Sequence, residues 1–209
     1  MSPATVRTTA ILEPASVYFL MMAYIWDLRM AHHSAWVPIL AGMVISHRLR
    51  GENASVLGFE LRRLRACFME FAPSLGLVVF LLLGSGILFR SIRPVHLPWF
   101  LSAWGAYLPW ALFQQYVMNG YFLNRLEGLV PPDRTPVVVA LLFSGAHLPN
   151  WFLMGVALLA GYCCAVIYRK YKNLYFLGLA HATIGALLLL VVPDSVSHHM
   201  IVGPGWFRP

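Results

Sequence analysis

Residues 174–192 read LYFLGLAHATIGALLLLVV and contain no Asp, Glu, Lys or Arg. Their number is close to the ~20 apolar residues that a helix needs to cross a bilayer. One ionisable residue, His181, interrupts the stretch. The bilayer core makes an ionisable side chain costly, so a residue of this kind is a candidate for function. The stretch therefore predicts a transmembrane helix and marks His181 as a candidate site residue.

The composition of the whole chain agrees with a membrane location. Of 209 residues, 59% are hydrophobic and 11% are charged, whereas soluble domains carry about 25% charged residues. The net charge of +7 would suit nucleic-acid binding, but the basic residues form short groups between apolar runs, as membrane-flanking anchors do. We therefore expect contact with the lipid bilayer and no nucleic acid. The length predicts a single membrane domain over residues 1–209.

Seven apolar segments predict an all-α fold, a polytopic integral membrane helix bundle of about seven spans. The second and fifth segments are short for lipid-exposed spans, which predicts tilted or central helices. Between the second and third, Ala54–Glu70 mixes apolar and basic residues and predicts an interfacial amphipathic helix, with a connecting loop as the alternative. With the first two spans it would form an N-terminal part over about residues 1–70. The segments are Ile11–Trp26, Trp36–Ser46, Pro73–Phe89, Leu97–Leu123, Pro136–Leu148, Trp151–Tyr168 and Leu174–Val192.

The basic residues predict the orientation, because cytoplasmic loops carry an excess of Lys and Arg. With the N-terminus in the cytoplasm, the basic residues divide about eleven inside against four outside. We expect an integral protein of a bacterial inner (cytoplasmic) membrane. The inside group is Arg7, Arg48, Arg50, Arg62, Arg63, Arg65, Arg125, Arg134, Arg169, Lys170 and Lys172, and the outside group is Arg29, Arg90, Arg93 and Arg208.

Two further polar clusters lie in apolar segments. Gln114 and Gln115 are followed by Asn119, which shares a helix face with Gln115, and His147 closes the pattern Phe143-Ser-Gly-Ala-His. A rise of about 1.5 Å per residue places Gln115, His147 and His181 roughly 10–17 Å from the cytoplasmic edge. Their matching depths predict one shared site. The alternatives are interhelical hydrogen-bonding by the amides and satisfied core histidines.

In order and spacing, these motifs resemble the CPBP family, the CAAX-protease and bacteriocin-processing membrane peptidases also called Abi proteins. The resemblance covers a motif core from Ala111 to about Leu190. It implies an intramembrane endopeptidase fold, in which a glutamate aided by a histidine activates water and a His-Asn pair stabilises the oxyanion. The family's Phe-x-x-x-His motif is intact at Phe143–His147.

The other motifs depart from the family pattern. Gln114 and Gln115 stand where the family has a Glu pair, Asn119 stands for its Arg, and Gly185 replaces the Asn or Asp of the motif that begins at His181. An amide is no useful general base near neutral pH. We therefore predict a homologue of intramembrane endopeptidases without ordinary proteolytic activity.

What such a protein does instead is open to several readings. It would act as a membrane binding protein or a complex subunit, with an apolar or peptide ligand or a membrane-protein partner. The alternatives are an active CAAX-type intramembrane endopeptidase and another His-dependent membrane enzyme. A metal ion held by His147 and His181 is a further expectation, since neutral imidazole is a common metal ligand.

Overall fold

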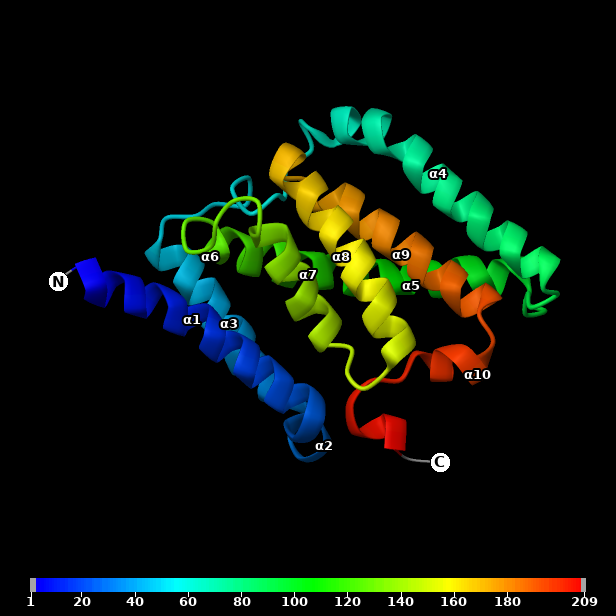
Figure 1. The fold of residues 1–209 in the computed structure, drawn as a ribbon, viewed down its shortest axis with the longest axis horizontal. Helices are drawn as coiled ribbons and strands as arrows, with labels where there is room; N and C mark the ends of the chain where they lie inside the picture. The colour runs from blue at the N-terminus through cyan, green and yellow to red at the C-terminus, as the bar shows by residue number, and fades with distance from the viewer. Residues whose placement is uncertain (1–2, 208–209) are drawn as a thin grey trace.

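The computed structural model describes the backbone of residues 3–207 and the side chains of residues 10–207. Arg7 and Arg208, which the orientation argument used, lie outside the described side chains. The described residues form helices and connecting loops, with no strand among them. The predicted all-α class is therefore confirmed (Figure 1).

Every predicted apolar segment is helical in the structure, although the bounds differ by several residues. The fourth segment is one continuous rod, because α5 passes through the π-helical segment η3 into α6 without a break. The α-helices and π-helical segments are α1 (Pro3–Ala23), η1 (Tyr24–Leu28), α2 (Arg29–Ala31), α3 (Trp36–Leu49), α4 (Leu64–Leu88), α5 (Leu97–Gln115), η3 (Tyr116–Leu123), α6 (Asn124–Leu126), α7 (Thr135–Gly145), α8 (Trp151–Tyr171), α9 (Leu174–Val191) and α10 (Asp194–Ser197).

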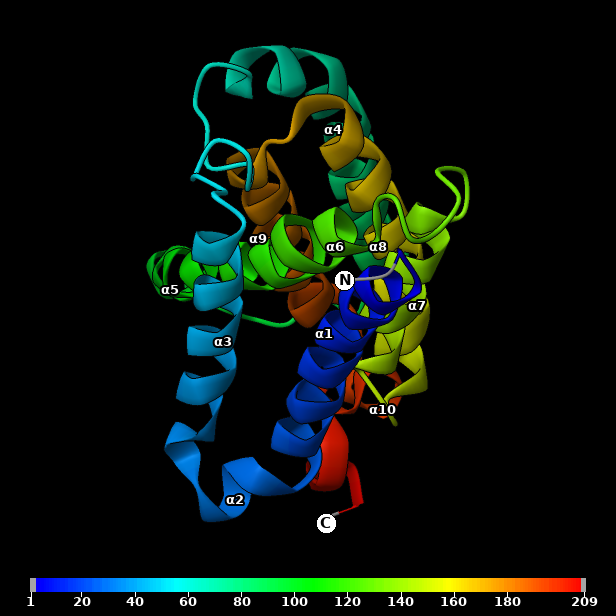
Figure 2. The ribbon, with the colours of Figure 1, turned by 90° about the vertical axis from the view of Figure 1, so that its left-hand side faces the viewer.

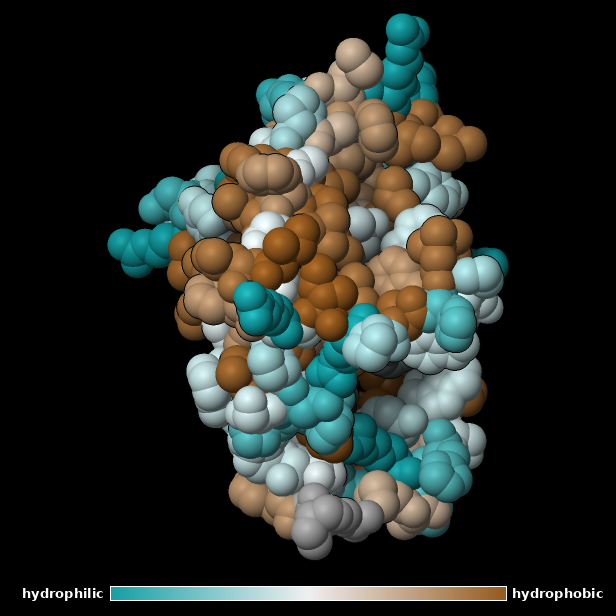
Figure 3. Space-filling model, turned by 90° about the vertical axis from the view of Figure 1, so that its right-hand side faces the viewer, coloured by the Kyte–Doolittle hydropathy of each residue, from teal (hydrophilic) through white to brown (hydrophobic). Residues whose placement is uncertain are grey.

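Four helical stretches are long and apolar enough to cross a membrane. They are Ala10–Ala31, Leu64–Leu88, Trp151–Tyr171 and Leu174–Val191, and α7 is a shorter apolar helix. Large apolar side chains cover much of the outer surface, which gives broad hydrophobic areas in Figure 3. Such areas would be unstable in water but suit lipid. The chain is an integral membrane protein whose apolar helices contact lipid.

The connections gather at two opposite ends of the bundle. In Figure 1 the N-terminus and the loops 50–63, 127–134 and 172–173 lie at the upper left, whereas loop 89–96, loop 146–150 and the C-terminal segment lie at the lower right. Figure 2 shows α1 and α3 as a hairpin joined through α2, with α4 on the opposite side of the molecule. This alternation is the one expected when successive segments cross a membrane in turn.

The prediction of an interfacial helix over Ala54–Glu70 is wrong. Residues 50–63 form a loop of turns, and the helix α4 starts only at Leu64. Gly58 has a φ of +91°, and a Cβ there would lie 2.7 Å from the Tyr168 ring. The backbone N–H of Leu174 donates to Gly58 O at 2.8 Å. Leu57 is therefore buried and Phe59 packs on the core of the bundle, whereas Val56 and Leu61 stay exposed.

The helices α5 and α9 approach each other closely in the middle of the bundle. A Cβ on Gly178 would lie 3.1 Å from the Cα of Leu112. A residue without a side chain is therefore needed for the two backbones to come together. This contact brings the glutamines of α5 next to His181 on α9.

Candidate functional site

A cavity of about 1310 Å³ lies between the α1–α3 hairpin and the helices α5, α7, α8 and α9. Its walls are mainly aliphatic and aromatic. Four of the five predicted site residues line it: Gln114, Gln115, His147 and His181. Most small-molecule sites are apolar cavities of about 300–1,000 Å³ with a few convergent polar groups. This cavity has that character and a larger volume.

A chain of hydrogen bonds connects α5 to α9 along the cavity wall. Asn119 Nδ2 donates to Gln115 Oε1 at 2.7 Å, and Gln115 Nε2 lies 3.1 Å from Nδ1 of His181. Since the Gln115 amide nitrogen only donates, Nδ1 of neutral His181 accepts, and its Nε2 carries the proton. That Nε2 lies 3.3 Å from the hydroxyl of Tyr107.

Asn119 does not line the cavity. Its side chain is 1% exposed and lies behind Gln115, with its Oδ1 atom lacking a hydrogen-bond partner among the described residues. It therefore holds Gln115 in position and cannot reach a ligand in the cavity. The structure thus separates this predicted site residue from the other four.

His147 is held by the C-terminal end of α7, as its place in the sequence predicts. Its Nδ1 donates to the backbone O of Phe143 at 2.7 Å, because a carbonyl only accepts. The Nε2 atom of neutral His147 then keeps its lone pair. The Phe143 ring lies edge-on to both histidines, with centroid distances of 4.8 Å to His147 and 5.9 Å to His181. The two histidines therefore face one cavity.

Tyr107 is a site residue that the sequence reasoning missed. Its ring is the nearest contact of Gly185, where a Cβ would lie 3.0 Å from Tyr107 Cε1. Tyr107 precedes Gln114 by seven residues, so two helical turns place both on one face of α5. This spacing in the sequence could have indicated that Tyr107 faces the same site as Gln114. Tyr107 occupies the space beside Gly185 into which a side chain at position 185 would extend.

A metal ion held by both His147 and His181 stays a prediction, and their hydrogen bonds bear on it. Both nitrogens of His181 are engaged, by Gln115 and Tyr107, so only His147 keeps a lone pair for a metal. The described residues contain no group of three or more His, Cys, Asp or Glu side chains placed to hold a metal ion. A metal at this site would need Gln115 to turn away from His181.

Comparison with known families identifies the segment that builds most of this cavity. Residues 96–187 match the family model described as "Type II CAAX prenyl endopeptidase Rce1-like". This segment is a CPBP-type, Rce1-like domain. No curated protein and no solved structure matched the chain. The resemblance read from the motifs is thereby confirmed over α5 to α9, where the segment is homologous to CPBP intramembrane peptidases.

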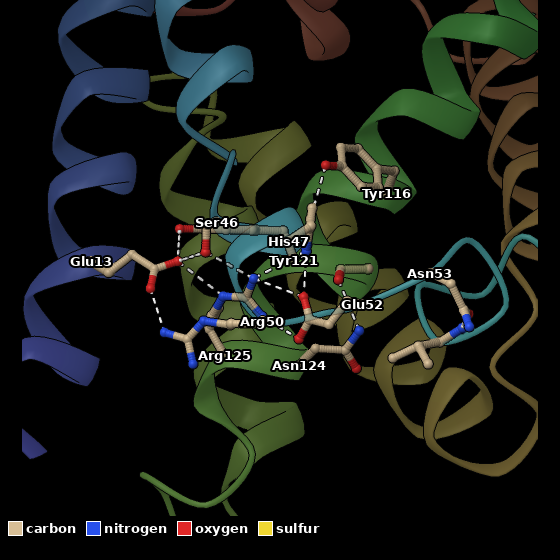
Figure 4. Close-up of polar contacts among 12 residues, drawn as sticks. Glu13, Ser46, His47, Arg50, Glu52, Asn53, Tyr116, Tyr121, Asn124 and Arg125 are labelled. Atoms are coloured by element: carbon tan, nitrogen blue, oxygen red, sulfur yellow. Dashed lines mark hydrogen bonds and ion pairs between the residues drawn. The ribbon is translucent and has the colours of Figure 1, made fainter. Parts of the chain in front are cut away.

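A second polar cluster joins the Rce1-like segment to the N-terminal helices (Figure 4). Arg125 of α6 is 2% exposed at its side chain, and its Nε donates to Glu13 Oε1 of α1 at 3.0 Å. Its Nη1 and Nη2 donate to Glu52 Oε1 and Oε2 at 2.8 and 2.9 Å. Glu13 also binds Ser46 and Tyr121. One buried guanidinium thus ties α1 and the loop after α3 to the central helix.

His47 connects this cluster to the helix of the cavity. Its Nδ1 lies 2.6 Å from Glu52 Oε2, and its Nε2 lies 3.0 Å from the hydroxyl of Tyr116. Tyr116 directly follows Gln115. Burial raises the pKa of the Glu52 carboxyl, but the bonds from Arg125 and His47 outweigh it, so the pKa lies below its ordinary value. Glu52 is therefore an ionised partner of Arg125.

The sequence reasoning missed this cluster. Arg125 reads in the sequence as one of several membrane-flanking cations, and Glu13 reads as a residue that weakens the first span. The sequence feature that could have indicated the cluster is Glu13, because an acidic residue within an apolar segment needs a partner. Which cation supplies it depends on the fold, since 112 residues separate Glu13 from Arg125.

Apart from Asp194, which binds the cavity-lining Arg93, the ion-paired acidic side chains lie away from the cavity. Glu13 and Glu52 are held by Arg125, Glu70 pairs with Lys170 at 2.6 Å, and Glu127 lies 3.6 Å from Arg169. None of the residues that line the cavity within the described part of the chain is Asp or Glu. The polar groups in the middle of the cavity are therefore amides, imidazoles and the Tyr107 hydroxyl.

Proposed function

We propose that this protein binds an apolar chain or apolar peptide in the cavity and does not carry out glutamate-dependent hydrolysis. The observation that carries the proposal is the absence of any carboxylate among the described cavity-lining residues. A general base must lie within hydrogen-bond reach of the water that it activates. The amide of Gln115, which takes the place of a family glutamate, holds His181 by donating to it.

The cavity walls support the binding role. Apolar and aromatic side chains from α1, α3 and α5 face the central polar groups, so a ligand chain loses water along most of its length. The Rce1-like description names prenyl endopeptidases. Prenylated peptides are therefore the first ligands to test. A membrane-protein partner that inserts an apolar segment is the second ligand class.

One observation favours a second candidate function, a His-dependent hydrolase. Nε2 of His147 keeps a lone pair and faces the cavity. An imidazole in that state is a general base near neutral pH. In this alternative, His147 would take a proton from water while Gln114 or His181 donates to the developing oxyanion.

The proposed setting is a bacterial inner membrane with the N-terminus in the cytoplasm. Basic side chains that include Arg48, Arg62, Arg134 and Lys170 belong to the end of the bundle that carries the N-terminus, whereas Arg90 and Arg93 lie in the loop at the opposite end. An excess of basic residues on the cytoplasmic side supports this orientation.

The test uses the purified full chain in mild detergent. Wild type should retain a prenylated tetrapeptide by native mass spectrometry and should not cleave it. A folded variant with Gln114→Glu, Gln115→Glu and Asn119→Arg should gain cleavage. Cleavage by wild type that His147→Gln abolishes would replace the proposal with the second candidate, and a chain that neither retains nor cleaves the peptide would contradict both for this ligand class.

A further inference from the structure

Two arginines lie at the end of the cavity that is near the C-terminal segment. Arg29 at the start of α2 and Arg93 in the loop before α5 both line the cavity wall. Nη2 of Arg29 donates to Val202 O at 3.0 Å. Nη1 and Nη2 of Arg93 donate to Asp194 at 2.8 and 2.6 Å. The rest of the cavity is predominantly apolar, so its positive charge is concentrated at this end.

Both guanidinium groups contain a buried donor without a partner. The Nε atoms of Arg29 and Arg93 are shielded from solvent and make no hydrogen bond among the described residues. A buried polar donor without a partner is rare, and the cost is larger when the group is charged. Guanidinium groups match the oxygens of carboxylates and phosphates in charge and geometry. Because these Nε atoms have no exposed surface, a headgroup in the cavity would meet the outer Nη atoms of the guanidinium groups, and an anionic oxygen matches their charge.

The two arginines differ in their pairing with the described carboxylates. Asp194 pairs with Arg93 and with His199, whose Nδ1 lies 3.0 Å from it. Arg29 forms no ion pair with a described carboxylate. The cavity wall therefore has two guanidinium groups and no described carboxylate. Figure 3, which views the side where α4 ends, shows a hollow with hydrophobic walls that is bordered by hydrophilic residues.

We propose that the cavity binds a single-chain anionic amphiphile, with its carboxylate or phosphate headgroup at Arg29 and Arg93 and its apolar chain extending toward Phe143 and His147. The inference rests on the proposed binding function and names its ligand class. The volume of about 1310 Å³ exceeds that of ordinary drug-sized sites, about 300–1,000 Å³, which suits a ligand with a long chain.

The experiment compares headgroups on one chain. The full-length protein in mild detergent is titrated with palmitate, hexadecyl phosphate or hexadecanol, and bound ligand is counted by native mass spectrometry. We expect the two anions to bind at least tenfold more tightly than the alcohol. Arg29→Gln should remove most of that preference, and Arg29→Lys should restore part of it. Arg134→Gln, at an exposed position, is the charge-matched control and should leave the preference unchanged.

Arg29→Gln is the decisive variant because it gives up only the bond to Val202. Arg93→Gln also breaks the pair with Asp194, so its melting temperature is measured beside its affinity. Equal affinity of wild type for palmitate and hexadecanol would overturn the headgroup assignment and leave the proposed binding of apolar chains standing. If Arg29→Gln retained the full preference for the anions, the assignment would also be overturned. Failure of all three ligands to bind would contradict the proposed function itself.

Discussion

The hydroxyl of Tyr107 lies 3.3 Å from Nε2 of His181, and the Tyr107 ring covers Gly185 one helical turn further along α9. By the resemblance of the motifs, Gly185 corresponds to the position of a family amide or acid that works with the histidine. Tyr107 thus fills the space beside position 185 and also satisfies the histidine proton. Restoring the family motif at position 185 therefore depends on Tyr107.

The first prediction concerns this pair. Gly185→Asn should destabilise the protein by about 1–3 kcal/mol, because the new side chain overpacks against the Tyr107 ring. The double variant Gly185→Asn with Tyr107→Ala should lose less unfolding free energy than the two single variants lose together, because the asparagine side chain then has room. Unfolding free energies of a double-mutant cycle measure the difference. Gly155→Asn is the control, because a Cβ at Gly155 meets nothing within 4 Å. Strict additivity of the two changes would show that Tyr107 does not restrict position 185.

A second prediction concerns the buried guanidinium. Arg125→Gln should destabilise the chain by about 3–5 kcal/mol, because it leaves Glu13 and Glu52 partly buried without their cation. Arg134→Gln, whose side chain is 75% exposed, should change stability by about 0.5 kcal/mol or less. Denaturant titration in detergent measures both. Equal losses of unfolding free energy for the two variants would show that the Arg125 ion pairs stabilise the fold no more than a surface charge does.

A third prediction follows from the ionisation of Glu52. Its pKa in the folded chain lies below the ordinary value of 4.5. A carboxylate with a depressed folded-state pKa stabilises the fold fully above its unfolded pKa and loses that contribution as the pH falls through the folded value. Wild type should therefore lose stability below a pH of about 4.5. The Glu52→Gln variant should be less stable than wild type at neutral pH, and its stability should change less as the pH falls. Parallel melting curves for both proteins from pH 7 to pH 3 would contradict this role of Glu52.

A fourth prediction tests whether the histidines share the cavity. In a chain whose native cysteines are replaced by alanine, His147→Cys with His181→Cys should cross-link through a short bifunctional reagent, because both histidines lie against Phe143. Phe80→Cys with His181→Cys is the control pair, since Phe80 is 71% exposed on the outer face of α4. Mass spectrometry after digestion measures the yields. A yield for the 147–181 pair no higher than the control would rule out the shared cavity.

Much of the architecture could be predicted from local sequence. The apolar runs decide which stretches become helices, because a backbone in lipid must satisfy its own hydrogen bonds. Polar residues within those runs, such as Gln115 and His181, stand out for the same reason. We predicted that they lie close together only from their similar depth in the membrane. In the structure, the close contact of Gly178 with Leu112 brings them together.

The sequence by itself therefore determined the helices, the membrane setting and the polar groups of the cavity. Only the tertiary structure decided which groups meet. It buried Arg125 between Glu13 and Glu52, folded loop 50–63 onto the bundle, and set Tyr107 over Gly185. Helix formation and hydropathy are local properties of a segment. Pairing between residues far apart in the chain depends on the rotation and packing of whole helices, which a local pattern does not encode.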